Sequence, residues 1–286
     1  MTGTRVLTAL VLVPVVVAAV WWGPSWLIAI LVGVVTLLAM FEFFALGARI
    51  GMRGYRLWTC FCALLLLSHQ WGVAKRFMSD PGMNPFRHLS EFANSVMPTE
   101  LILCVFVLGA ALIALASRRP IAEGLPAIGI SAAGLLFVAL PFSYIVLLHS
   151  TGALGPKLLL FVLVLVWVGD TAAYFIGRAI GRHPMAAQLS PKKTWEGAIA
   201  NLLGSMLVAV AFYRWIAPLP VLFGAAALGN IAGQIGDLVE SAYKRSAGVK
   251  ESGGLLPGHG GMLDRIDALI LAAPVVWYYF LLARLR

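Results

Sequence analysis

Residues able to bind a metal ion or to take part in a reaction are concentrated in the second half of this 286-residue chain. Seven of the 12 Asp and Glu residues fall in about one hundred positions. They are Asp170, Glu196, Asp237, Glu240, Glu251, Asp264 and Asp267. Several lie in or beside apolar segments, where a carboxylate is costly unless it faces a polar cavity or a partner. We therefore expect the chemistry of this protein in its C-terminal half.

A glycine-rich segment, residues 253–267, carries the clearest pattern. Its glycines leave backbone N–H groups open to a ligand. Asp264 and Asp267 follow at the start of an apolar run, and their spacing of three puts them on one face of a helix. Carboxylates so placed suit Mg²⁺, which commonly uses one or two of them together with substrate phosphate. The simpler alternative is a loop followed by acids that cap a helix, with His259 in a structural role.

A basic segment, residues 190–197, reads Ser-Pro-Lys-Lys-Thr-Trp-Glu-Gly. Lys192 and Lys193 precede the predicted start of a helix, and ammonium groups beside a helix N-terminus favour a polyphosphate ligand. Ser190 and Thr194 add two hydroxyl groups. The alternative is a basic anchor beside the membrane, attracted to anionic lipid.

Two further polar positions lie in apolar surroundings. Asp237, Ser241 and Lys244 are spaced by four and three residues, so they share one helix face. That face is either part of a polar site or an ordinary Asp–Lys pair at the water boundary. Asp170 lies within an apolar run and is either a site residue or the partner of a neighbouring cation.

The elements that must position these residues are membrane helices, because 61% of the residues are hydrophobic and only 12% are charged. Soluble domains carry roughly 25% charged residues. A spanning helix needs about 20 apolar residues, and nine runs approach that length. The runs are residues 6–22, 25–47, 57–74, 100–117, 124–148, 157–177, 197–214, 219–239 and 264–283. We predict an all-α, polytopic membrane protein with about nine transmembrane helices: about five in an N-terminal part, 1–150, and the others in a catalytic part, 151–286.

The distribution of basic residues predicts the orientation. Of the 21 Lys and Arg residues, 14 belong to the N-terminus and to alternate connections, including those near 178–196 and 240–265. Basic connections stay on the cytoplasmic side. We therefore expect a multi-pass protein of the inner or plasma membrane, its active site facing the cytoplasm and its C-terminus outside. The net charge of +9 then reflects topology and does not predict binding of nucleic acid.

Cations, glycine backbone and carboxylates on one side of the membrane are the groups that phosphoryl or nucleotidyl transfer requires. The chain has no G-x-x-x-x-G-K-[ST] motif, which argues against a P-loop nucleotide hydrolase. The acceptor should be a lipid, because the site opens from the bilayer interior.

The stretch from Ser241 to Asp267 resembles the signature of the phosphatidate cytidylyltransferases, the CDP-diacylglycerol synthases. That signature reads S-x-apolar-K-R-x4-K-D and, after a short spacer, H-G-G-apolar-x-D-R-apolar-D. The positions that match it in order and spacing are Ser241, Lys244, Arg245, Lys250, His259, Gly260, Gly261, Asp264, Arg265 and Asp267. Glu251 stands where the family usually has Asp. The run 190–197 resembles the family's upstream motif, and the resemblance covers about residues 165–270.

This resemblance implies that CTP and phosphatidate react to give CDP-diacylglycerol and pyrophosphate. On that basis we assign Asp237, Asp264 and Asp267 to a Mg²⁺ site, and the family suggests K⁺ as a second cation. We expect Lys250 and His259 to act with these acids as catalytic residues. The expected substrate-binding residues are Ser190, Lys192, Lys193, Thr194, Glu196, Ser241, Lys244, Arg245, Gly260, Gly261 and Arg265.

Two other functions are compatible with parts of the pattern. A CTP-dependent transferase or kinase acting on a polyprenyl-type lipid would keep the site and change the acceptor. A cation-coupled secondary transporter would use Asp170 and Asp237 as ion ligands near the membrane midplane. The chain shows no inverted repeat, and its acids cluster with basic loops, which disfavours the transporter. The many small residues in the predicted helices are compatible with a homodimer.

Overall fold

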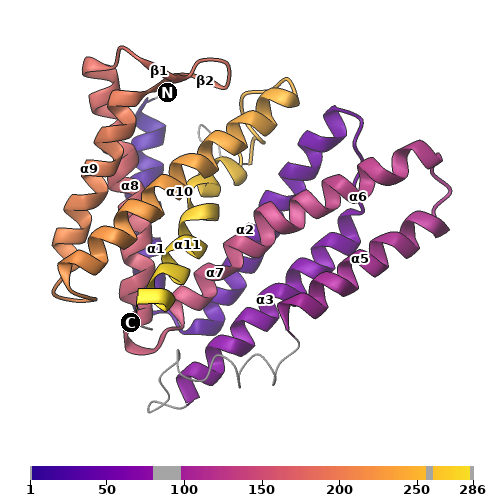
Figure 1. Cartoon of the computed structure of the whole chain (residues 1–286), viewed down its shortest axis with the longest axis horizontal. Coiled ribbons are helices and arrows are strands. Elements are labelled where there is room, and N and C mark those ends of the chain that lie inside the picture. Colours follow the sequence, from indigo (N-terminus) through magenta and orange to yellow (C-terminus); the bar gives the residue numbers. More distant parts are fainter. Residues whose placement is uncertain (1, 80–97, 256–259, 284–286) are drawn as a thin grey trace.

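The computed structural model describes residues 2–79, 98–255 and 260–283 of the chain. Within these ranges the protein is almost entirely helical, and its only sheet is one two-stranded hairpin. The prediction of an all-α, polytopic membrane protein is therefore confirmed (Figure 1).

The N-terminal part of the chain forms helices that lie mainly on one side of the bundle (Figure 1). Their bounds are α1 Thr2–Trp22, α2 Ser25–Arg49, α3 Arg56–Ser79, α5 Thr99–Ala116, η1 Ile121–Glu123, α6 Gly124–Ala133, η2 Gly134–Ala139 and α7 Leu140–His149. The segments α6, η2 and α7 follow one another without a break, and η2 is π-helical. They form one long helix, which the single predicted run 124–148 anticipated.

The C-terminal part supplies the helices around the candidate site. Their bounds, with those of the hairpin, are η3 Gly152–Leu154, α8 Gly155–Ile180, β1 Pro184–Ala186, β2 Ser190–Thr194, α9 Trp195–Phe212, α10 Leu219–Ser246 and α11 Leu263–Ala283. The strands β1 and β2 are antiparallel, with Pro184 opposite Thr194 and Ala186 opposite Ser190. The basic segment is therefore a strand that runs directly into α9.

Seven helices in the described ranges are long and apolar enough to cross a membrane. They are α2, α5, α9, α10, α11, the continuous helix Ile121–His149 and the helix Gly152–Ile180. The predicted runs 6–22 and 57–74 are helical, in α1 and α3, but are not among the seven. In α1 the apolar stretch covers Leu12–Trp22, and in α3 it is interrupted by Ser-His-Gln at 68–70. The count of nine stays a prediction.

The C-terminal part is built from two helix pairs. Helix α8 packs against α9, α10 packs against α11, and α9 also contacts α10. Helix α7 contacts α11 as well as α2 and α3, so it joins the two halves of the chain. Phe44, Leu148 and Phe161 are completely buried in the shared core.

Glycine allows α8 and α9 to approach closely. A Cβ atom on Gly204 would lie 3.1 Å from the Cβ of Ala172 and 3.3 Å from the carbonyl oxygen of Val168. A Cβ atom on Gly169 would collide with the amide oxygen of Asn201. Small residues at a helix–helix contact let backbones pack directly, which is a main source of association inside a bilayer. The approach of α8 and α9 therefore depends on these glycines.

We predict that Gly169→Ala destabilises the protein by about 1–3 kcal/mol, the usual cost of an added group in a tightly packed core. Thermal unfolding in detergent, followed by circular dichroism, measures this. Gly129→Ala is the matched control, because Gly129 is an exposed helical glycine with no atom within 4 Å of an added Cβ. An equal midpoint for both variants would contradict the close packing of α8 against α9.

Candidate active site

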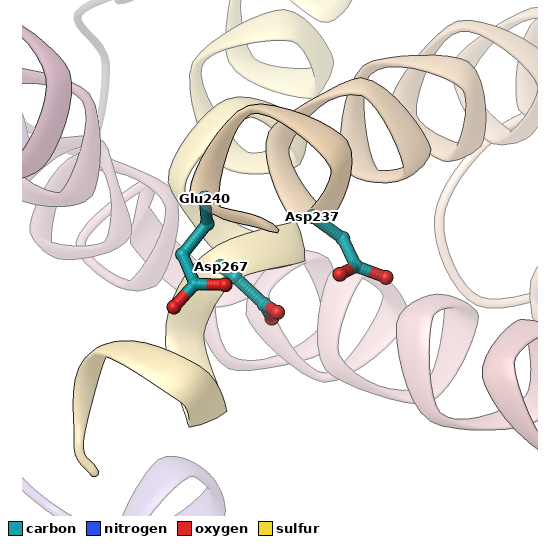
Figure 2. A group of neighbouring side chains, drawn as sticks. All are labelled: Asp237, Glu240 and Asp267. Atoms are coloured by element: carbon teal, nitrogen blue, oxygen red, sulfur yellow. The ribbon is translucent and has the colours of Figure 1, made fainter. Parts of the chain in front are cut away.

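Three carboxylates from α10 and α11 lie close together (Figure 2). Asp237 and Glu240 lie on α10 and Asp267 lies on α11, and each offers an oxygen within 4.8 Å of the other two. The two helices meet closely here, because a Cβ atom on Gly236 would lie 2.5 Å from the carbonyl oxygen of Asp267. The structure thus brings together two of the three predicted metal ligands, Asp237 and Asp267, and adds Glu240.

Lys244 links this group to the start of α11. Its ammonium group lies 2.5 Å from a carboxylate oxygen of Glu240 and 2.6 Å from one of Asp264. Glu240 is completely buried, so the ion pair compensates a charge that would otherwise be very costly. Sequence reasoning treated Lys244 as a substrate-binding residue and did not single out Glu240. The spacing of three between Asp237 and Glu240, which repeats that of Asp264 and Asp267, could have indicated it.

Asp264, the third predicted metal ligand, lies outside the carboxylate group and organises the glycine-rich segment. Its Oδ2 accepts hydrogen bonds from the backbone N–H of Ser252 at 2.9 Å, the Ser252 hydroxyl at 2.9 Å and the backbone N–H of Gly261 at 2.8 Å. Its Oδ1 faces Lys244. Gly260 has a positive φ of 77°, and a Cβ atom there would lie 2.8 Å from Asp264 Oδ2. Glycine at 260 is therefore required by both the backbone and the carboxylate.

Glu42 on α2 holds the same segment from the other half of the chain. Its carboxylate accepts hydrogen bonds from the backbone N–H groups of Met262 at 2.9 Å and Leu263 at 2.8 Å. It also lies 3.0 Å from the Ser252 hydroxyl, whose single proton it shares with Asp264. The acid thus caps the N-terminus of α11, where a negative charge is favoured. Sequence analysis gave Glu42 no role, because no local pattern connects residues some 220 positions apart.

A cavity of about 710 Å³ opens beside the carboxylate group. Helices α8, α9 and α10 and the hairpin line it. Its lining includes Asp170, Arg178, Lys192, Lys193 and Asp237. The ammonium group of Lys193 lies 2.6 Å from a carboxylate oxygen of Asp237. The cavity therefore places cations and carboxylates within reach of one bound molecule.

Strand β2 forms the basic rim of this cavity and runs into the start of α9. Thr194 caps the helix, its hydroxyl accepting a hydrogen bond of 3.2 Å from the backbone N–H of Gly197. The Glu196 carboxylate lies 2.6 Å from Nδ1 of His183 and accepts a hydrogen bond from the His183 backbone N–H. Glu196, predicted to bind substrate, fastens the segment before the hairpin to the helix, and its substrate role stays a prediction. Lys192 is exposed to the cavity.

A chain of side-chain amides leads to Asp170. Gln234 donates a hydrogen bond to the amide oxygen of Asn230, Asn230 donates to that of Asn201, and Asn201 donates to the Asp170 carboxylate at 3.1 Å. Each amide donates to the next group in this chain, which ends on the Asp170 carboxylate. Sequence reasoning left Asp170 between a structural and a site role. Its place in the cavity lining favours the site role.

The remaining predicted residues are distributed around this centre. Arg245 donates to the backbone carbonyl oxygens of Leu189 and Val249, and so holds the hairpin connection against the end of α10. Ser241 is buried, whereas Lys250 and Arg265 are exposed. Ser190 begins β2 and does not line the cavity. Gly261 lies beside Glu42 and Asp264. His259 falls outside the described residues.

The carboxylate group has the donor chemistry of a Mg²⁺ site. Mg²⁺ prefers oxygen ligands and keeps part of its coordination shell for water or substrate phosphate. Asp237, Glu240 and Asp267 supply carboxylate oxygens only. Oε1 of the buried Glu240 accepts no hydrogen bond from the described residues, so it has a free acceptor position. These residues fit such an ion.

The fold and this centre together define a polytopic membrane protein with a cavity that combines lysines and carboxylates. Comparison with known proteins agrees with that class. The model of the Cytidylyltransferase family matches residues 3–283, and the chain belongs to this family.

Curated relatives of the chain are named phosphatidate cytidylyltransferase. The protein from Brucella suis is 42% identical over 181 residues, which cover 61% of this chain and 63% of the relative. The protein from Haemophilus influenzae is 41% identical over 136 residues, covering 44% and 46%. The protein from Staphylococcus saprophyticus is 40% identical over 143 residues, covering 49% and 54%. The chain thus spans roughly half to three fifths of the length of these relatives.

We predict that Glu42→Gln loosens the start of α11 while the helices stay folded. Hydrogen bonds to a charged acceptor contribute about 1.5–3 kcal/mol, so the amides of Met262 and Leu263 should exchange about tenfold faster or more. Hydrogen–deuterium exchange in detergent measures this directly. Glu100→Gln, an exposed acid on α5, is the control for lost charge and should leave the exchange of both amides unchanged. Equal exchange in the Glu42 variant and the wild type would remove the capping role.

Proposed function

We propose that this protein transfers the cytidylyl group of CTP to phosphatidate, giving CDP-diacylglycerol and pyrophosphate. The observation that carries the proposal is the carboxylate group of Asp237, Glu240 and Asp267 beside a cavity with a basic rim. Membership of the Cytidylyltransferase family supports nucleotidyl transfer, and the names of the relatives support phosphatidate as the acceptor.

The basic rim suits the triphosphate. Lys193 reaches Asp237, and Lys192 is free to face the cavity. When a triphosphate enters, the ammonium group of Lys193 can exchange its carboxylate partner for phosphate oxygens, and Lys192 adds a second charge. Both cations then offset the negative charge that builds up on the departing pyrophosphate.

The reaction itself requires little proton transfer. A phosphate oxygen of phosphatidate attacks the α-phosphorus of CTP, and the bond from that phosphorus to the oxygen bridging to the β-phosphorus breaks. The nucleophile is an anion near neutral pH, so no strong base is needed. The protein contributes alignment and charge compensation, which are the main contributions in phosphoryl-type transfers.

Mg²⁺ would be held by Asp237, Glu240 and Asp267 and would neutralise charge on the reacting phosphates. Asp264 would position its neighbours and would not bind the ion, because its oxygens already contact Lys244, Ser252 and Gly261. It keeps the glycine-rich segment and the carboxylate group in a fixed relation. The K⁺ ion suggested by the family resemblance stays a prediction.

The lipid acceptor would enter from the bilayer, which surrounds the helices that line the cavity. We place the cavity on the cytoplasmic side of the inner membrane, which is supported by the distribution of Lys and Arg and by the bacterial relatives. A homodimer stays a prediction.

The test is product formation by detergent-purified protein given CTP, Mg²⁺ and phosphatidate. CDP-diacylglycerol should appear together with an equal amount of pyrophosphate. Binding of CTP without this product, or product only from a polyprenyl-type phosphate, would reject phosphatidate as the acceptor. If protein shown to be folded neither binds CTP nor forms product, the nucleotidyltransferase activity is rejected.

The two acids of α11 should respond differently to substitution. We expect Asp267→Asn to lose at least about a hundredfold in turnover, because an interaction with transition-state charge is worth about 2.7–4 kcal/mol. Asp264→Asn should also lose turnover, but with the same Mg²⁺ concentration for half-maximal rate as the wild type. Titrations of Mg²⁺ for both variants, with Glu123→Gln on η1 as a charge-matched control, measure this. A shifted Mg²⁺ requirement in Asp264→Asn would return that residue to the metal site.

Lys193→Ala should raise the KM for CTP about tenfold or more, the usual effect of removing a charged hydrogen-bonding partner. The KM for phosphatidate should change much less. Initial rates at varied CTP and fixed phosphatidate give this value. An unchanged CTP dependence would make Lys193 only a structural partner of Asp237.

A further inference from the structure

A second cavity, far along the chain from the candidate active site, has no role in the proposed reaction. Its volume is about 520 Å³, and it lies where α2 ends, α3 begins and α5 ends. Its lining residues are Ala48, Arg53, Gly54, Tyr55, Arg56, Leu57, Trp58, Ile113 and Arg119. We propose that this cavity binds the phosphate head group of an anionic glycerophospholipid.

The first observation is an excess of positive charge. Arg53, Arg56 and Arg119 all line the cavity, and none of them forms an ion pair with a carboxylate in the part of the chain that the structure describes. Near the candidate active site, by contrast, Lys193 and Lys244 are each paired with at least one acid. Three arginines together without acids favour a phosphate ligand, because guanidinium groups present several N–H donors in one plane.

The second observation is that the cavity wall is fixed by contacts. The guanidinium group of Arg119 donates a hydrogen bond of 2.6 Å to the carbonyl oxygen of Arg53 and lies over the Tyr55 ring, 5.3 Å from its centroid. The backbone N–H of Tyr55 donates to the Ser131 hydroxyl at 2.8 Å. A Cβ atom on Gly54 would lie 2.9 Å from side-chain carbon atoms of its neighbours. The Arg119 side chain and the backbone from Arg53 to Tyr55 are therefore held in place before any ligand arrives.

The third observation is a buried hydroxyl group without a partner. Tyr55 is only 6% exposed, lines the cavity, and its hydroxyl forms no hydrogen bond within the described ranges. Buried polar groups are nearly always hydrogen-bonded, so one without a partner needs an explanation. An acceptor oxygen of a bound phosphate supplies one.

The fourth observation favours a lipid over a soluble anion. Leu57 lines the cavity and is 84% exposed, and Leu115 near the end of α5 is 85% exposed. Of the seven candidate spans α5 is the one least covered by protein, so its surface faces the hydrocarbon. A cluster of cations at the end of apolar, uncovered helices matches a phospholipid, whose charged head is attached to apolar chains.

This cavity lies on the same membrane face as the candidate active site. Glu42, near the end of α2, contacts the start of α11, and Arg245 joins the end of α10 to the hairpin connection. Arg119 joins the end of α5 to the connection between α2 and α3. The proposed lipid would therefore occupy the leaflet that faces the reaction, at a position separate from it.

The experiment is native mass spectrometry of the detergent-purified protein with dioleoyl phosphatidylglycerol or dioleoyl phosphatidylcholine. The wild type should retain the anionic lipid more strongly than the zwitterionic one. Arg119→Gln should weaken retention of phosphatidylglycerol about tenfold, as expected for loss of a charged hydrogen-bonding partner. The matched control is Arg118→Gln, which removes the same charge from an exposed neighbour that does not line the cavity. Equal retention of both lipids by the wild type, or equal loss in both variants, would overturn the proposal.

Two additions keep the result decisive. Tyr55→Phe removes only the unpaired hydroxyl, so it should fold and weaken phosphatidylglycerol binding a few-fold even if Arg119→Gln fails to fold. Unchanged binding in this variant would show that the Tyr55 hydroxyl does not contact the lipid phosphate, and it would contradict the proposed site. Glycerol 3-phosphate carries the phosphate without acyl chains. Displacement of the lipid by it at equal concentration would identify a site for soluble anions and reject the lipid.

Discussion

Charge inside an apolar helix bundle must be compensated, and the ion pairs of Lys244 are the interaction on which the candidate active site depends. One ammonium group lies against both Glu240 and Asp264 and so fixes α10 relative to the start of α11. Without that cation, two carboxylates in mostly apolar surroundings would be left unpaired, which is strongly destabilising. With it, Glu240 can remain close enough to two further acids, Asp237 and Asp267, to serve a cation together with them.

The rest of the centre is organised by the same need for partners. Asp264 gathers Ser252 and Gly261, Glu42 satisfies the first N–H groups of α11, and the amides of α9 and α10 end on Asp170. Each contact gives a polar group a hydrogen-bond partner that lipid could not supply. Polar residues in membrane helices therefore usually lie where such a partner exists. These contacts fix the groups around the centre, and within it Oε1 of Glu240 keeps a free acceptor position.

Much of this could be predicted from the sequence, and the missing parts have physical reasons. The apolar runs gave the helices closely, because backbone groups in a bilayer must bond within their own segment. The spacing around Asp237 and Asp267 indicated the site. Glu240 was missed because its pairing with Lys244 looks like an ordinary helix pair. Asp264 was grouped with Asp267 because their spacing of three places both on one helix face, whereas its oxygens contact Lys244, Ser252 and Gly261. No sequence pattern could relate Glu42 to the glycine-rich segment.

The contact between Glu42 and Met262 also has a consequence for biogenesis. The ribosome adds residues at about 5–20 per second, so α2 is made roughly ten to forty seconds before the segment that it caps. During that interval its carboxylate has none of the three hydrogen-bond donors that it meets in the finished protein. Insertion of α11 is therefore the step that gives Glu42 its partners and completes the carboxylate centre. A chain halted before this step would leave Glu42 without these partners in the membrane.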